Sequence, residues 1–176
     1  RELAIVAEEL GATLAPIPWF ETAALSVTLL NLCNASSHLA QIASGKCIAT
    51  LAWRDAAGRA DAIGPELRNG KLCGAAHFVP FGHAVDLLLV AARADDGVAL
   101  CAIEASARGV AIQKQTSLDL TRPSASIAFD GAAATVLDPD AELTLAYGFA
   151  ISAAILAAEQ VGAAARPDPR QDRRAA

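Results

Sequence analysis

Three tight-turn dipeptides separate short apolar runs in the middle of the chain. Asn69-Gly70, Asp96-Gly97 and Asp130-Gly131 each lie between such runs. Dipeptides of this kind favour two-residue hairpins, because the central residues of a type I′ turn need positive φ angles. The segment from Thr50 to Leu137 is therefore predicted to consist of short β-strands joined by hairpins, with helices before and after it.

Helical periodicity precedes the hairpin segment. The chain opens on Arg1-Glu2-Leu3, with neither Met nor a signal-peptide pattern, and is expected to begin partway into a helix. Residues 1–11 place apolar side chains on one helical face, with Gly11 as the predicted C-cap. Two prolines then interrupt the helix. Leucines return at helical spacing over residues 21–34, and a further short helix is expected to end at Gly45.

The strands expected in the middle segment follow its apolar runs. Residues 86–94 form a nearly continuous apolar run, which is typical of a strand covered on both faces. Residues 55–64 are rich in Gly, Ala and Asp and are predicted to be a loop. The other expected strands are residues 47–51, 66–68, 71–79, 98–105, 109–112 and 125–129. A set of this kind suits a small barrel or sandwich.

One long apolar segment follows, from about Ala141 to Ala164. Its length invites a membrane-spanning interpretation, but Glu142, Tyr147 and Glu159 shorten the uninterrupted apolar run below the ~20 residues that a bilayer requires. We expect a helix that packs among other helices and needs neighbours on several sides, because it is apolar nearly all round. Residues 166–176 are polar with two prolines and are predicted to be a disordered tail; a basic tail that binds an acidic partner is the alternative.

Composition and charge exclude several classes of function. The 176 residues carry 14 Lys and Arg against 19 Asp and Glu, and this mild acid excess argues against a nucleic-acid partner. The four cysteines form no CxxC pair, so we expect small buried thiols in a reducing compartment and a cytoplasmic protein. His38, His77 and His83 share no ligand spacing, and no metal site is predicted.

Several short segments together point to one protein family. They are Glu8–Gly11, Ile42–Lys46, Gly70–Gly74 with Phe78-Val79, Ala84–Asp86 with Leu89–Arg93, Leu118–Arg122, Ile127–Gly131, and Glu159–Gly162. In order and spacing, over residues 1–164, they resemble the flavin-dependent acyl-CoA dehydrogenase family. The resemblance implies an α+β fold with an antiparallel, β-barrel-like middle domain. It places a helical N-terminal remnant at 1–45, the middle domain at 46–137, and the first helix of a truncated C-terminal domain at 138–165.

The resemblance also implies where FAD would lie. The family's first flavin-binding loop falls on residues 53–61, and its aromatic strand falls on residues 78–80. The cofactor-binding residues expected on this basis are Leu51, Ala52, Trp53, Arg54, Phe78, Val79 and Pro80. Ala60 occupies the position of a serine that contacts acyl-CoA. Two positions depart from the family: Arg54 replaces a hydroxyl residue, and Pro80 offers neither a hydroxyl nor an amide donor.

The activity implied by the resemblance is FAD-dependent formation of an α,β double bond in an acyl-CoA thioester, a step of fatty acid or lipid metabolism. Family members remove the α-proton with a carboxylate of the C-terminal bundle, and no residue here matches it. Asp55, Asp61, Asp86 and Glu104 are explained by turn and surface positions, so no catalytic residue is predicted. We expect this chain alone to be inactive and to form a homo- or hetero-oligomer.

Two other functions stay open at this point. The substitutions at Arg54 and Pro80 are compatible with a non-catalytic partner subunit of a heteromeric acyl-CoA dehydrogenase. A free-standing β-barrel module that binds a small apolar ligand is a third hypothesis, and it depends on fold analogy alone.

Overall fold

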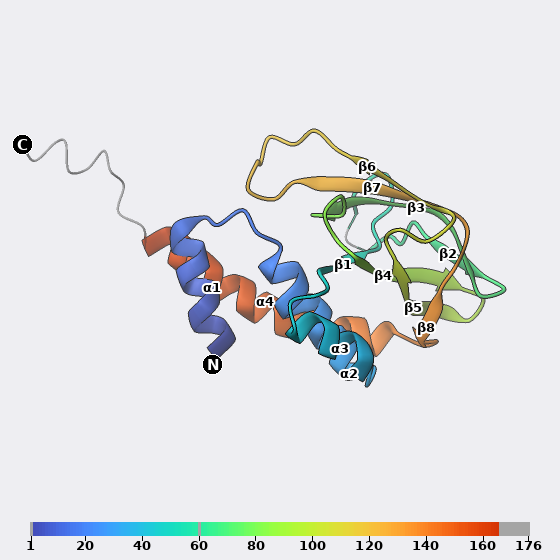
Figure 1. Ribbon diagram of the computed structural model, residues 1–176, viewed down its shortest axis with the longest axis horizontal. Helices are drawn as coiled ribbons and strands as arrows, with labels where there is room; N and C mark the ends of the chain where they lie inside the picture. The colour runs from blue at the N-terminus through green and yellow to red at the C-terminus, as the bar shows by residue number, and fades with distance from the viewer. Residues whose placement is uncertain (1, 60, 166–176) are drawn as a thin grey trace, which may run out of the picture.

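The computed structural model describes residues 2–59 and 61–165 and has the α+β architecture that the sequence predicts, with the helices gathered beside one curved sheet (Figure 1). The helices are α1 (Glu2–Thr13), the π-helical segment η1 (Phe20–Ser26), α2 (Val27–Leu32), α3 (Ser36–Ala43) and α4 (Glu142–Ala165). The strands are β1 (Ala49–Ala52), β2 (Glu66–Arg68), β3 (Lys71–Pro80), β4 (Leu87–Ala94), β5 (Gly97–Glu104), β6 (Val110–Lys114), β7 (Ser124–Ala133) and β8 (Thr135–Asp138). The predicted division into domains stays a prediction, and the predicted tail lies outside the described residues.

The sheet is mixed and open. Its strands follow the order β6-β7-β3-β2-β4-β5-β8, and β1 pairs with β4 beside this path. Most pairs are antiparallel, as expected, but β1 and β2 both run parallel to β4. The long connection from β1 through β2 and β3 makes the parallel β1–β4 pair possible. Strand β8, which pairs with β5, was not among the predicted strands.

Strand β4 is buried on both faces, as predicted. Leu88 and Val90 face the core inside the curved sheet, between β3, β5 and β7. Leu87 and Leu89 face a second core, which the helices close with residues such as Leu29 of α2. One strand therefore joins the sheet to the helical layer, and this explains why its sequence is apolar at consecutive positions rather than at alternate ones.

The hairpin signals have three different outcomes. Asn69-Gly70 forms the β2–β3 turn with φ angles of 50° and 72°, as a type I′ turn requires. Asp95-Asp96 connects β4 to β5, and of this turn only Gly97, with φ 131°, is left-handed. The turn predicted at Asp130-Gly131 is wrong, because β7 continues through it. Gly131, with φ 62°, lies in a bulge where the pairing with β3 shifts register after Leu72.

Gly11 is not the C-cap that the sequence predicts. Helix α1 continues to Thr13, and Gly11 is buried inside it. A Cβ atom at Gly11 would overlap the carbonyl oxygen of Glu159 on α4, and one at Gly162 would overlap the carbonyl oxygen of Glu8 on α1. The two glycines therefore permit the backbones of α1 and α4 to touch. Close backbone packing, and not helix termination, explains the glycine at position 11.

Helix α4 is long and apolar enough to cross a membrane by length and composition, and 22% of its most apolar window is buried. It packs against α1, η1 and α2, so the expected helical neighbours are present on one side. Its other side leaves apolar residues exposed: Leu143, Tyr147, Ile151 and Val161. The expectation of neighbours on several sides is therefore met only in part among the described residues.

Arg122 connects the sheet to two helices. It lies in the β6–β7 connection, which reaches from the sheet toward the helices (Figure 1). Its Nη2 atom donates to both carboxylate oxygens of Glu159 on α4, at 2.6 and 2.7 Å. Its Nη1 atom lies 3.9 Å from Oε1 of Glu21 on η1, and its guanidinium covers the ring of Phe20 at 5.4 Å. This ion cluster fixes how the helices sit on the sheet.

The cysteines divide into two buried and two half-buried thiols. Burial raises the pKa of Cys101 to about 11, and it also raises the pKa of Cys47 and of Cys33. Because a thiol reagent must reach the sulfur atom, we expect the half-buried Cys33 and Cys73 to be modified in the native protein, and the buried Cys47 and Cys101 only after denaturation. Mass spectrometry after timed alkylation measures this order. Early labelling of Cys101 would contradict the packing of β5.

Candidate functional site

The two segments predicted to contact a flavin lie side by side. The backbone N–H of His77 on β3 donates to the carbonyl oxygen of Arg54, just after β1, at 2.9 Å. The Thr50 hydroxyl on β1 donates to the carbonyl oxygen of Pro80 at 2.9 Å. Residues 51–54 and 78–80 are therefore neighbours in the fold, and their contacts with a cofactor stay predictions.

Three of the predicted residues turn their side chains inward. Ala52 and Val79 belong to the core inside the sheet, and Leu51 belongs to the core under the helices. All three residues are buried as a whole, and their backbones pair with neighbouring strands, so none of them presents an exposed surface to a ligand. The side chains that remain for recognition are those of Trp53, Arg54 and Phe78.

Trp53 and Arg54 form a stacked pair with unused donors. The Arg54 guanidinium carbon lies 4.8 Å from the centre of the Trp53 ring, and that ring contacts Phe149 of α4 at 5.3 Å. The Nε1 atom of Trp53 and the Nε atom of Arg54 are both buried and find no acceptor among the described residues. Because buried N–H groups are nearly always hydrogen-bonded, two neighbouring orphan donors indicate a place for an acceptor-rich or anionic ligand.

Phe78 is held in a strained conformation. Its φ angle is 54° and that of Phe81 is 52°, at a point where the β3–β7 register shifts between Ala76 and Val79. Phe78 as a residue is 44% exposed, and its ring lies so close to Gly58 that a Cβ atom at position 58 would require an adjustment. Strain of this kind concentrates at functional sites, and here it turns an aromatic face outward next to the 55–59 loop.

Pro80 cannot replace the family's hydroxyl donor. It has no backbone N–H, and its carbonyl oxygen already accepts from Thr50. The neighbouring N–H of Phe81 donates to the carbonyl oxygen of Pro123 at 2.7 Å. Ala60, the predicted acyl-CoA contact, lies outside the described residues.

Acidic residues near the site are engaged elsewhere. Asp55, which follows Arg54, accepts from Nη2 of Arg59 at 2.9 Å. Although partial desolvation opposes the effect, hydrogen bonds from Arg59 hold the pKa of Asp55 below its usual value. Asp86 accepts from the backbone N–H of Ile48 at 2.9 Å. Within residues 2–59 and 61–165, no three His, Cys, Asp or Glu side chains gather where they could hold a metal ion.

Sequence reasoning missed one buried carboxyl group. Glu21 of η1 is 3% exposed, and desolvation raises its pKa although a backbone hydrogen bond and the charge of Arg122 oppose the shift. It belongs to a π-helix, whose widened turn is not visible in a residue pattern. The only sequence signal is an acidic residue inside a helical apolar run.

Comparison with known proteins identifies the fold. No family model and no curated protein matches the sequence. Among solved structures, butyryl-CoA dehydrogenase from Megasphaera elsdenii matches with a TM-score of 0.79 at 17% identity, over 90% of this chain and 48% of that chain. The ChsE4-ChsE5 complex from Mycobacterium tuberculosis matches with a TM-score of 0.73 at 23% identity, over 92% and 46%. PigA with FAD and proline matches with a TM-score of 0.78 at 20% identity, over 93% and 49%.

The chain therefore has the acyl-CoA dehydrogenase fold. The resemblance found in the sequence is confirmed at the level of the fold, by structures that include a butyryl-CoA and a glutaryl-CoA dehydrogenase. The chain spans about half the length of the solved structures that it matches.

Proposed function

We propose that the chain provides the flavin-facing sheet and helices of an FAD-dependent acyl-CoA dehydrogenase-type oxidoreductase. The observation that carries this proposal is the pair of buried, unpartnered donors on Trp53 and Arg54, next to the outward-facing ring of Phe78. These groups occur at the two segments where the resemblance expects FAD. The isoalloxazine ring offers a flat aromatic face and an edge rich in acceptors, and it therefore suits this set.

Each residue has a specific part in this proposal. Arg54 supplies a charged donor where the family has a hydroxyl, and a charge-assisted hydrogen bond compensates for the donor that Pro80 lacks. Trp53 holds the guanidinium by stacking and is itself fixed by Phe149 of α4. Phe78 presents apolar surface to the ring. When bound, FAD would accept the hydride that leaves the β-carbon of the acyl-CoA.

The described residues do not supply the base for proton removal. A general base must reach the proton and must have a pKa near the working pH. Asp55 is the acid next to the site, but its pairing with Arg59 lowers its pKa and makes it a weak base. We therefore propose that the carboxylate comes from outside residues 2–59 and 61–165, and that this chain alone does not turn over acyl-CoA.

A second candidate is a non-catalytic partner subunit of a heteromeric acyl-CoA dehydrogenase. Two observations favour it: Pro80 cannot donate a hydrogen bond, and one side of α4 carries exposed apolar residues such as Leu143 and Tyr147. One of the matching structures is itself a complex of two named components, ChsE4 and ChsE5. An exposed apolar helix face of this kind is suited to a protein interface.

Replacing Arg54 with leucine is expected to weaken FAD binding by about ten- to a hundredfold, because a charged hydrogen bond contributes about 1.5–3 kcal/mol. Fluorescence anisotropy of FAD titrated with the full chain measures the affinity. Arg108→Leu, at an exposed arginine of the β5–β6 connection, is the matched control and should leave the affinity unchanged.

The outcomes separate the two candidates. Equal affinity of the Arg54 variant and the wild type would contradict the proposed role of Arg54. A chain that binds no FAD, but forms a stable complex with a complete acyl-CoA dehydrogenase homologue, would support the partner subunit. A chain that does neither would contradict both proposals.

A further inference from the structure

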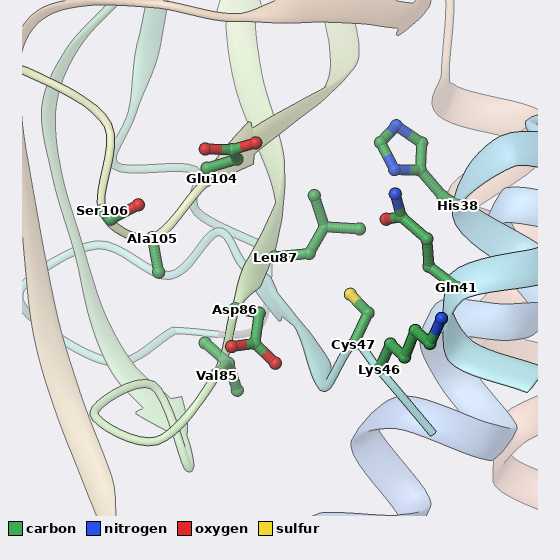
Figure 2. A pocket seen from close by; sticks show the side chains of 10 residues that line it. All are labelled: His38, Gln41, Lys46, Cys47, Val85, Asp86, Leu87, Glu104, Ala105 and Ser106. Atoms are coloured by element: carbon green, nitrogen blue, oxygen red, sulfur yellow. The ribbon is translucent and has the colours of Figure 1, made fainter. Parts of the chain in front are cut away.

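A hollow of about 430 Å³ lies between α3 and the adjoining ends of β4 and β5 (Figure 2). It shares no residue with the predicted flavin site. Its volume falls in the range of small-molecule sites, which is about 300–1,000 Å³. Apolar side chains, including Val85 and Leu87, form part of its lining, and polar side chains enter it from both sides.

The two sides of the hollow differ in charge. His38 and Gln41 of α3, with Lys46 just beyond it, form one wall and bring a cationic group. Asp86, directly before β4, and Glu104, the last residue of β5, form the other wall. The β4–β5 ladder pairs Leu87 with Glu104, and Asp86 directly precedes Leu87, so both acids lie at the same end of the sheet.

These polar groups have free binding capacity. Among the described residues, the side chains of Gln41, Lys46 and Glu104 make no hydrogen bond or ion pair. Asp86 uses Oδ2 for the N–H of Ile48 and keeps its other oxygen. The Nδ1 atom of His38 is buried and has no partner. A buried ring nitrogen without a partner is an uncommon feature in a folded protein and indicates a missing hydrogen-bonding group.

We propose that this hollow binds a small zwitterion of the amino-acid type with an apolar body. Its ammonium group would face Asp86 and Glu104, and its carboxylate would face Lys46 and Gln41. The apolar residues of the lining would cover its side chain. A ligand with only one charge would leave one wall unpaired, and this difference gives the site its selectivity. The proposal is independent of flavin binding.

The experiment compares three probes that differ by one group. Leucine carries both charges, isocaproate lacks the ammonium group, and isoamylamine lacks the carboxylate. Titration of the full chain, followed by amide NMR shifts around His38, should show saturable binding of leucine. The other two probes should bind about tenfold more weakly, because each loses one set of charged hydrogen bonds.

Two conservative variants assign the charges to their walls. Glu104→Gln should weaken the binding of leucine and isoamylamine about tenfold and leave the affinity for isocaproate unchanged. Lys46→Gln should weaken the binding of leucine and isocaproate about tenfold and leave the affinity for isoamylamine unchanged. Lys114→Gln and Glu9→Gln, at exposed charges of other elements, are the matched controls. Absence of saturable leucine binding, equal affinity for the three probes, or unchanged affinity in both wall variants would overturn the proposal.

Discussion

Replacing Gly162 with valine is expected to push α1 away from α4 and to lower the free energy of unfolding by about 3 kcal/mol. The new side chain would overlap the carbonyl oxygen of Glu8, which belongs to the backbone and cannot rotate away. Helix propensity works in the opposite direction, because glycine is disfavoured in helices, so the loss reports the packing of α1 against α4. Urea unfolding followed by circular dichroism measures the loss, and hydrogen exchange of the α1 amides shows the separation.

Ala154→Val is the control for this substitution, because Ala154 lies on the exposed side of the same helix. It should change the free energy of unfolding by no more than about 0.5 kcal/mol. If Gly162→Val were as stable as this control, α1 and α4 could not be in the backbone contact that the structure describes.

Removing the Arg122 guanidinium should have the next largest effect. Arg122→Met leaves the carboxylates of Glu21 and Glu159 without their shared cation. We expect a loss of about 2–3 kcal/mol at neutral pH, less than for a fully buried pair, because the Arg122 side chain is 33% exposed. Arg59→Met is the control, because the Arg59 side chain is 66% exposed and pairs with Asp55. This substitution should lower the free energy of unfolding by less than about 1 kcal/mol. Equal losses would show that the cluster does not connect sheet and helices.

The same cluster predicts a dependence on pH. Desolvation raises the pKa of Glu21 in the folded protein above its ordinary value, so the folded state binds this proton more tightly than the unfolded chain. The stability that protonated Glu21 contributes is therefore fully present below the ordinary carboxyl pKa. It is lost as the pH rises through the raised pKa of Glu21 in the folded protein. Glu21→Gln should become progressively more stable than the wild type over this interval. If the free energies of unfolding of the wild type and of Glu21→Gln changed in parallel with pH, the burial of an ionisable Glu21 would be contradicted.

The fold could be predicted where local chemistry and tertiary packing agree. Asn69-Gly70 turns because both residues tolerate left-handed angles, and β4 is apolar throughout because it is buried on two sides. At Asp130-Gly131 the same dipeptide signal produces a bulge, because β3 continues alongside and its pairing keeps β7 extended. At Gly11 the absence of a side chain permits close contact between α1 and α4. This contact is between segments distant in sequence, so the residues around Gly11 do not indicate it.

The candidate site could be placed only through the family resemblance, and the structure adds what spacing cannot supply. Residues 51–54 and 78–80 come together through hydrogen bonds between strands that are distant in sequence. The unpartnered donors of Trp53 and Arg54 depend on how α4 covers the Trp53 ring. Glu21 and the hollow beside α3 depend on tertiary burial, for which the sequence holds no local signal.

The visible absorption spectrum of the full chain, incubated with FAD and freed of unbound cofactor, tests the central claim most directly. The arrangement of Trp53, Arg54 and Phe78 predicts retained flavin bands that are displaced from those of free FAD. A colourless protein with native circular dichroism would show that this sheet does not bind a flavin by itself, and would contradict the account.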